Sequence, residues 1–135
     1  MDDCIFCKVV SGELEANLVH ESPGAVAFLD KHPSARGHTL VIPRRHAPTL
    51  LDLPDEHVEG LFRAVKEVQA KVARALEPIA FNVGWNHGRA AGQHVLHLHV
   101  HVLPRYAAPG PGVQALGEGA ARMDLAAIAE AIRKA

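Results

Sequence analysis

The pattern of apolar and polar positions along the chain predicts one long helix among several short extended segments. Between Pro54 and Pro78, apolar residues recur at helical spacing: Val58, Leu61, Phe62, Val65, Val68, Val72 and Leu76. Pro54, followed by two acidic residues, suits the first turn of this helix, and Pro78 closes it. We expect the apolar stripe of this helix to pack on the core.

Short apolar runs bounded by turn-forming residues predict five strands, over residues 17–21, 25–30, 39–42, 79–86 and a segment that starts at residue 97. A short helical turn is expected over residues 4–14, and Asp124 is expected to cap a last short helix. The glycine- and proline-rich residues 107–112 are predicted to be irregular. The pattern predicts an α+β fold, a five-stranded antiparallel sheet with one long helix and short terminal helices, in a single domain spanning residues 1–135.

The segment from residue 97 carries the chemistry. Successive side chains of a strand point to opposite faces, so Leu98, Val100 and Val102 are predicted to form an apolar face. The opposite face is then a row of imidazoles, His97, His99 and His101. Neighbours on one face are roughly 6.6 Å apart, too far for three rings on a straight strand to share one metal ion. We therefore expect the three histidines to divide their roles.

Composition bounds the class of protein. The 135 residues carry 14 basic and 15 acidic side chains, a formal net charge of −1. This balance argues against a polybasic nucleic-acid binder but allows a small phosphorylated ligand. The sequence lacks an apolar run long enough to span a bilayer, and its N-terminus lacks the layout of a signal peptide. We expect a cytoplasmic protein without membrane or nucleic-acid partners. Pairing of one exposed sheet edge with a second copy would protect it, which makes a homodimer plausible.

Cys4 and Cys7 form a Cys-x-x-Cys pair. In a reducing compartment such a pair is typically redox-active or metal-binding. A redox pair would be expected after a strand, whereas this one precedes every predicted strand. With ten histidines available, the spacing favours half of a metal site.

The segment from Gly92 to Arg105 reads GQHVLHLHVHVLPR and resembles the signature of the histidine triad superfamily, in which Gly-Gln precedes three alternating histidines. Further blocks resemble its bacterial, Hint-like branch and occur in the order of that family: CIFCK from Cys4, AFLD from Ala27, GHTLVIP from Gly37 and the segment from Asn82 to Gly88. Together they cover residues 4–105, leaving 106–135 as a tail.

The resemblance implies that His99 is the nucleophile, which attacks the α-phosphorus of a nucleotide and forms a covalent nucleotidyl-histidine. A neutral imidazole is competent for this role. His101 and Gln93 would bind the phosphate or stabilise its developing charge. The implied reaction is removal of a nucleoside monophosphate, AMP, from a phosphoramidate, acyl or phosphate leaving group.

The resemblance also implies the nucleotide-binding residues. Asp30 would accept hydrogen bonds from the ribose, and Asn86, His38 and His94 would lie beside the nucleotide. A slot for the purine base would be formed by Ile5, Phe6, Val9, Phe28 and Leu40. His94 stands where relatives carry serine, threonine or an acidic residue, and Lys31 and His32 also depart from the family pattern. The residues themselves do not select the leaving group.

A structural zinc site is the last implication of the resemblance. Its ligands would be Cys4, Cys7, His46 and His97, a closed tetrahedral set of two thiolates and two imidazoles. Two other readings of the histidine row stay open. One is a metal-dependent hydrolase in which His97 and His99 hold a catalytic ion, and the other is a non-catalytic protein that binds purine nucleotides. His20 and His57 are expected at the surface.

Overall fold

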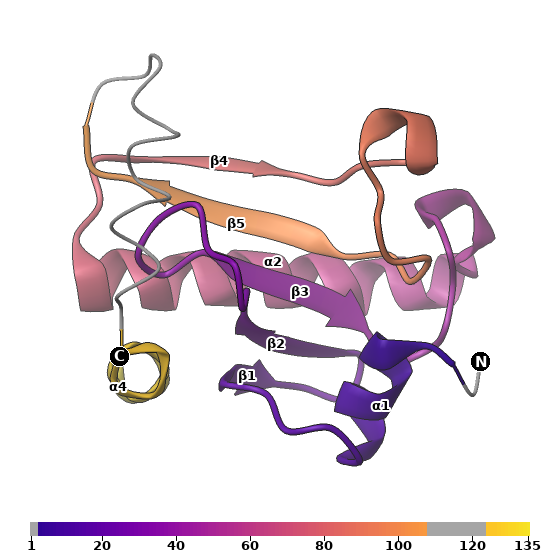
Figure 1. Cartoon of the computed structure of the whole chain (residues 1–135), viewed down its shortest axis with the longest axis horizontal. Coiled ribbons are helices and arrows are strands. Elements are labelled where there is room, and N and C mark those ends of the chain that lie inside the picture. The colour runs from indigo at the N-terminus through magenta and orange to yellow at the C-terminus, as the bar shows by residue number, and fades with distance from the viewer. Residues whose placement is uncertain (1–2, 108–123) are drawn as a thin grey trace.

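The computed structural model describes residues 3–107 and 124–135. Five strands form one antiparallel sheet in the order β1-β2-β3-β5-β4 (Figure 1). The elements in chain order are α1 (Ile5–Ser11), β1 (Leu18–Glu21), β2 (Ala25–Leu29), β3 (Thr39–Pro43), η1 (Leu50–Asp52), α2 (Asp55–Leu76), β4 (Ala80–Gly84), η2 (Arg89–Ala91), β5 (Val100–Arg105) and α4 (Leu125–Lys134). The predicted α+β architecture is confirmed, including the long helix and the terminal helix capped by Asp124. Residues 108–112 of the predicted irregular segment lie outside the described residues.

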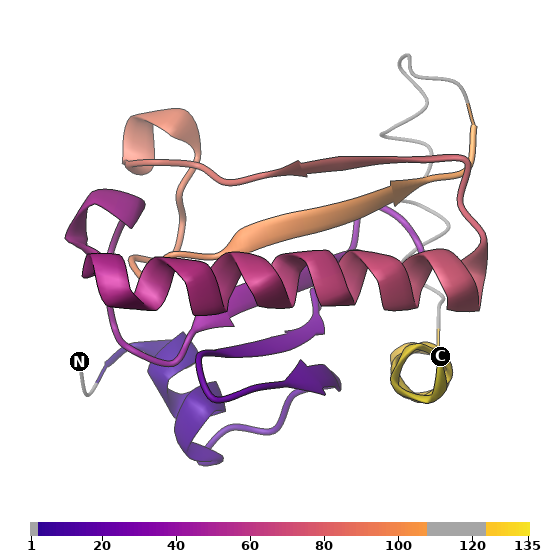
Figure 2. The ribbon, with the colours of Figure 1, turned by 180° about the vertical axis from the view of Figure 1, so that it is seen from behind.

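The long helix α2 runs across one face of the sheet (Figure 2). Its stripe of Leu61, Val65, Val68 and Val72 is buried, as the helical spacing predicted. It ends where Glu77 adopts a left-handed φ of 51° just before Pro78. Gly37 also has a positive φ, and a Cβ there would lie 2.4 Å from Leu76, so a glycine is needed for this close approach to the helix end.

Alternation along β2 and β3 divides the apolar side chains between two clusters. Ala25, Ala27 and Leu29 face the main core with α2, and Val41 of β3 joins them. On the other face, α1 packs on a smaller cluster whose buried members are Phe6, Val9, Val26, Phe28, Leu40 and Ile42. The sheet therefore supports a second apolar surface under α1.

The predicted straight histidine strand is wrong at its beginning. β5 starts at Val100, so His97 and His99 precede the sheet and only His101 belongs to it. The physical reason is a competing partner, because the main-chain N–H of Leu98 donates to the carbonyl of Ala47 at 2.8 Å. The apolar alternation itself holds, since Leu98, Val100 and Val102 are all buried.

The expectation of a surface position for His20 is also wrong. Its side chain is 9% exposed, and its Nε2 lies 3.0 Å from Glu67 of α2. Lys71 of the same helix is 3.0 Å from its Nδ1. Within the described ranges, none of the helices is long and apolar enough to cross a membrane.

Candidate functional site

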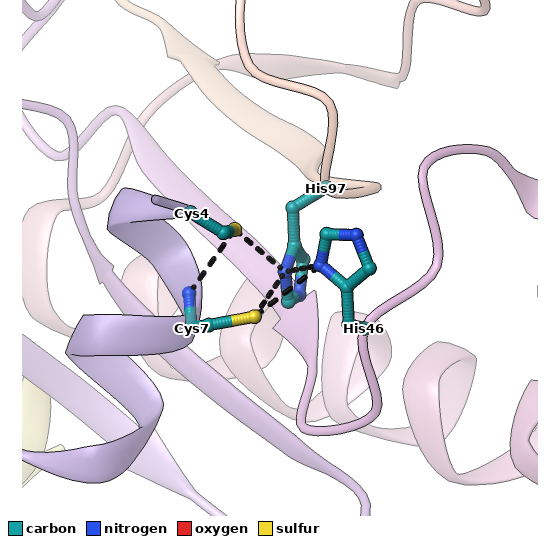
Figure 3. Close-up of side chains that lie close together, drawn as sticks. All are labelled: Cys4, Cys7, His46 and His97. Atoms are coloured by element: carbon teal, nitrogen blue, oxygen red, sulfur yellow. Dashed lines mark hydrogen bonds between the residues drawn. The ribbon is translucent and has the colours of Figure 1, made fainter. Parts of the chain in front are cut away.

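Two cysteines and two histidines converge at the N-terminus of α1 (Figure 3). Cys4 is the N-cap of α1, and its sulfur accepts a hydrogen bond from the N–H of Cys7 at 3.3 Å. His46 comes from the chain after β3, and His97 from the chain before β5. The sequence thus places four soft or borderline donors from three distant segments at one point, and one donor atom from each lies within 4.8 Å of the others.

The spacing of these donors fits a tetrahedral metal ion. Cys4 Sγ is 3.4 Å from His97 Nδ1, Cys7 Sγ is 3.3 Å from His46 Nδ1, and the two Nδ1 atoms are 3.3 Å apart. Metal–sulfur and metal–nitrogen bonds of about 2.3 and 2.1 Å give tetrahedral edges of about 3.4–3.8 Å. The four residues could therefore hold a metal with little rearrangement.

Two features of the donors suit them to a cation. His97 Nε2 donates to the carbonyl of Pro43 at 2.9 Å, which leaves the Nδ1 lone pair facing the other three donors. Burial lowers the pKa of His97 to about 4, so the ring is neutral, as a ligand must be. Burial and the neighbouring Cys4 raise the pKa of the Cys7 thiol to about 11, a cost that a bound cation would offset by stabilising the thiolate.

A cavity of about 670 Å³ opens beside this cluster. It is the size of a small-ligand site, with one apolar wall and one polar wall. The apolar wall includes Ile5, Phe6, Val9, Phe28 and Leu40, and the polar residues include Asp30, His38, Asn86, His94, His99 and His101.

His99 has a fixed tautomer. Its Nδ1 lies 2.8 Å from the carbonyl oxygen of His97 and must donate the hydrogen bond, since a carbonyl only accepts. In the neutral ring, Nε2 then carries the lone pair. The ring of Phe6 packs edge-on against His99 with centroids 5.1 Å apart. The arrangement presents an oriented nucleophilic nitrogen at the cavity.

His101 has the opposite tautomer. The N–H of Ser34 donates to His38 Nδ1 at 3.1 Å, so His38 carries its proton on Nε2. His38 Nε2–H donates to His101 Nδ1 at 3.0 Å. Because His101 Nδ1 accepts this hydrogen bond, the one proton of the neutral His101 ring lies on its Nε2. Burial, and then the neighbouring His38 and His99, lower the pKa of His101 to about 4. His101 is therefore a neutral hydrogen-bond donor beside a lone-pair nitrogen.

Asp30 completes the polar wall. Its Oδ1 accepts from the N–H of His32 at 2.9 Å, and its Oδ2 is 3.8 Å from His38 Nε2. Asp30, His38 and His101 also offer three donor atoms close enough for a metal ion. In the hydrogen bond assigned above, the proton of His38 Nε2 lies between the two facing histidine nitrogens. We therefore interpret the three residues as a polar network and not as a metal site.

Gln93 does not line the cavity with the other predicted site residues. Its side chain is 1% exposed, and its Oε1 accepts from the N–H of Gly88 at 2.8 Å. Its Nε2 donates to the carbonyls of Pro48 and Val95 at 2.6 and 3.0 Å. The amide is fully used in holding the loop before His97, which leaves it no free donor for a phosphate.

The structure thus brings the other predicted residues together in two adjoining places, the Cys/His cluster and the cavity. Sequence reasoning did not identify several cavity residues on the segment between α1 and β1, before His38 and before β5. They include Leu14, Glu15, Ala16, Asn17, Ser34 and Val95. They lie on irregular chain, where no periodicity marks the inward-facing side chains.

The fold is a five-stranded antiparallel sheet with helices, a histidine-lined cavity and an adjoining Cys/His cluster, and comparison with known proteins gives its family. The HIT domain model matches residues 11–108. The chain belongs to the histidine triad (HIT) family.

Relatives agree in sequence and in structure. The adenosine 5'-monophosphoramidase of Schizosaccharomyces pombe is 41% identical over 102 residues, covering 76% of this chain and 74% of that protein. A Hit-like protein of Bartonella henselae superposes with a TM-score of 0.84 at 29% identity, covering 99% and 97% of the two chains. A zinc-bound histidine triad protein of Mycobacterium smegmatis has a TM-score of 0.75 at 31% identity, covering 98% and 95%.

Proposed function

We propose that this protein is a nucleotidyl hydrolase or transferase that removes AMP from a phosphoramidate, acyl or phosphate leaving group through a covalent intermediate on His99. The observation that carries the proposal is the hydrogen bond from His99 Nδ1 to the carbonyl of His97, which fixes a lone pair on Nε2 at the cavity. The S. pombe relative is named for activity on an adenosine monophosphoramidate, which supports AMP as the transferred group.

The cavity offers a place for each part of the nucleotide. The purine would lie in the slot formed by Ile5, Phe6, Val9, Phe28 and Leu40, and the ribose hydroxyls would donate to Asp30. Asn86, His38 and His94 would lie beside the sugar and phosphate. His101 Nε2–H would donate to a phosphate oxygen as charge develops.

The reaction would proceed in two displacements. His99 Nε2 attacks the α-phosphorus, the bond to the leaving group breaks, and its electron pair departs with that group, which takes up a proton from solvent. Water then attacks the phosphorus and loses a proton to solvent, the N–P bond breaks, its electron pair returns to Nε2, and AMP is released. Splitting one displacement into two lowers each barrier. Gln93 would act by positioning the loop before His97.

We further propose that Cys4, Cys7, His46 and His97 bind zinc, as the donor distances and the zinc-bound M. smegmatis structure support. The ion would supply a structural cross-link between α1 and the chain segments flanking β3 and β5. A catalytic ion shared by His97 and His99 is disfavoured, because His97 directs its free nitrogen to the cysteines.

A homodimer is the third part of the proposal. β4 is an edge strand of the sheet and exposes Val83, which is 43% accessible, and Trp85 directly after the strand is 39% accessible. Antiparallel pairing of two β4 strands would cover these side chains and continue the sheet into the second copy.

Turnover of adenosine 5'-phosphoramidate, measured with saturating substrate with and without EDTA, tests the proposed reaction. We expect AMP release that persists under chelation, and an acid-labile, base-stable adduct on His99 in trapping experiments. Loss of all activity with EDTA, restored by metal, would establish a metallohydrolase instead. Nucleotide binding without turnover would establish a binding protein.

A further inference from the structure

Phe6 lies between two of the proposed metal ligands and contacts the proposed nucleophile. It occupies α1 between Cys4 and Cys7, and its ring is 7% exposed. The ring meets His99 edge-on at 5.1 Å between centroids and meets His97 at 6.0 Å. The first turn of α1 therefore directs the sulfurs of Cys4 and Cys7 to the Cys/His cluster and the ring of Phe6 to the cavity.

The helix that carries Phe6 depends on few attachments. α1 has only seven residues, and a helix of this length is not stable by itself in water. Within residues 3–107 and 124–135, the side-chain hydrogen bonds that join α1 to distant parts of the chain run through the sulfurs of Cys4 and Cys7. Its other anchors are the buried side chains of Phe6 and Val9.

A second connection runs through His97. Its Nδ1 faces the sulfurs, while its carbonyl oxygen holds His99 Nδ1 at 2.8 Å. Any shift of the His97 main chain therefore changes the orientation of His99 directly. The cluster and the nucleophile are joined both by an aromatic contact and by a main-chain hydrogen bond.

We propose that Phe6 is a positioning residue through which metal binding at the Cys/His cluster and nucleotide binding in the cavity reinforce each other. The inference rests on the proposed function. Metal binding ties α1 to the chain beside β3 and β5, which fixes the wall formed by Phe6 and Val9 before the nucleotide arrives. A nucleotide packed on that wall in turn restrains the two sulfurs in the geometry that the metal requires.

Thermodynamic linkage makes the effect reciprocal. The factor by which metal raises affinity for a nucleotide must equal the factor by which the nucleotide raises affinity for the metal. Couplings of this kind are about fivefold or larger, and we expect roughly that factor in each direction here.

Two titrations measure the coupling. AMP binding is followed by calorimetry in metal-free protein and in protein loaded with zinc, and we expect about fivefold or tighter binding in the loaded form. Zinc affinity is measured by competition with a chromophoric chelator, with and without saturating AMP. Both titrations include the metal-free form, so its circular dichroism spectrum is recorded to check that it stays folded.

Phe6→Ala and Val9→Ala form a matched pair. Both residues lie on α1, both are buried, and both line the cavity, so both substitutions should weaken AMP binding. The aromatic contact with His99 belongs to Phe6. We expect Phe6→Ala to lower the coupling factor well below the wild-type value, leaving the part carried by His97, and Val9→Ala to retain most of it. If melting shows that Phe6→Ala does not fold, Phe6→Leu replaces it and should also show reduced coupling.

The outcomes separate this inference from the proposed function. Equal AMP affinity with and without zinc overturns the inference while leaving nucleotide binding intact. Equal loss of coupling in the Phe6 and Val9 variants overturns the role of Phe6. Absence of AMP binding in both metal states overturns the proposed function and the inference together.

Discussion

His97 holds His99 through its main chain, since the carbonyl oxygen of one accepts from Nδ1 of the other at 2.8 Å. The ring of His97 meanwhile faces the cysteines through its own Nδ1. The two histidines are adjacent members of one motif, yet His97 presents a lone pair to the Cys/His cluster and His99 presents a lone pair to the cavity. Local hydrogen bonds, rather than residue type, divide their roles.

Replacement of His99, the proposed nucleophile, gives the most direct test of the reaction. His99→Ala should lower turnover by about a thousandfold or more while leaving AMP binding and the fold nearly unchanged. His57→Ala is the matched control, because this histidine lies on α2 and does not line the cavity. Steady-state kinetics and mass spectrometry of trapped protein measure the effect. Retention of turnover or of the adduct in His99→Ala would exclude His99 as the nucleophile.

The proposed metal ligands predict metal content. Wild-type protein purified without added zinc should contain one zinc per chain, and the double variant Cys4→Ser, Cys7→Ser should contain none and melt at a lower temperature. Elemental analysis and thermal denaturation measure this. Lys8→Ser, which changes a residue of the same helix outside the ligand set, is the control. Unchanged zinc content in the double variant would disprove the site.

Gln93 should contribute to stability more than to chemistry. Gln93→Ala removes three hydrogen bonds to main-chain groups and should lower the free energy of unfolding by about 2–3 kcal/mol. The exposed neighbour His94 lacks such bonds among the described contacts, so His94→Ala should change stability by less than about 0.5 kcal/mol. Urea denaturation compares the two, and an equal effect would contradict the positioning role.

Acid should destabilise the fold through His101. Its pKa is lowered to about 4 in the folded chain, and an unfolded histidine titrates near about 6.5. Between these values the unfolded chain binds more protons, so the free energy of unfolding falls as the pH drops from about 6.5 towards 4. Urea denaturation at several pH values should show a shallower pH dependence for His101→Asn than for wild type. Identical slopes would contradict this origin.

The exposed edge of the sheet predicts the oligomeric state. Val83→Lys places a charge on β4 and should convert a dimer to a monomer. Leu51→Lys is the control, because Leu51 is 85% exposed but lies on η1, outside the five strands of the sheet. Sedimentation equilibrium measures both variants. A monomeric wild type would refute the dimer, and a dimeric Val83→Lys would place the interface elsewhere.

The periodicity of apolar residues predicts the sheet and the long helix, because the apolar side chains of these elements are the ones that become buried in the core. The alternation of Leu98, Val100 and Val102 also placed them correctly in the core. It could not show that β5 starts only at Val100, because that boundary depends on a hydrogen bond from Leu98 to Ala47, a residue distant in sequence.

The sequence motifs identify most residues of the candidate site, but not how those residues are protonated or bonded. Resemblance placed Asp30, His38, His99 and His101 at one cavity, and the structure agrees. It could not assign the protons on the histidine rings, since each tautomer depends on a hydrogen-bond partner. The partner is the N–H of Ser34 for His38, the carbonyl of His97 for His99 and the ring of His38 for His101. The resemblance also assigned a phosphate contact to Gln93, whose amide is instead occupied by main-chain groups on both sides.

Because β5 begins at Val100, His99 and His101 are held by the structure in different ways. His101 lies in the ladder, opposite Leu40 of β3 and Gly84 of β4, and is clamped from both sides. His99 precedes the first paired residue, and its ring is held by the carbonyl of His97 instead of by the ladder. In a displacement, phosphorus travels toward the attacking nitrogen as the old bond lengthens. In the proposed reaction, the ring that must approach the phosphorus would therefore lie outside the ladder, while the donor to the phosphate oxygens would lie within it.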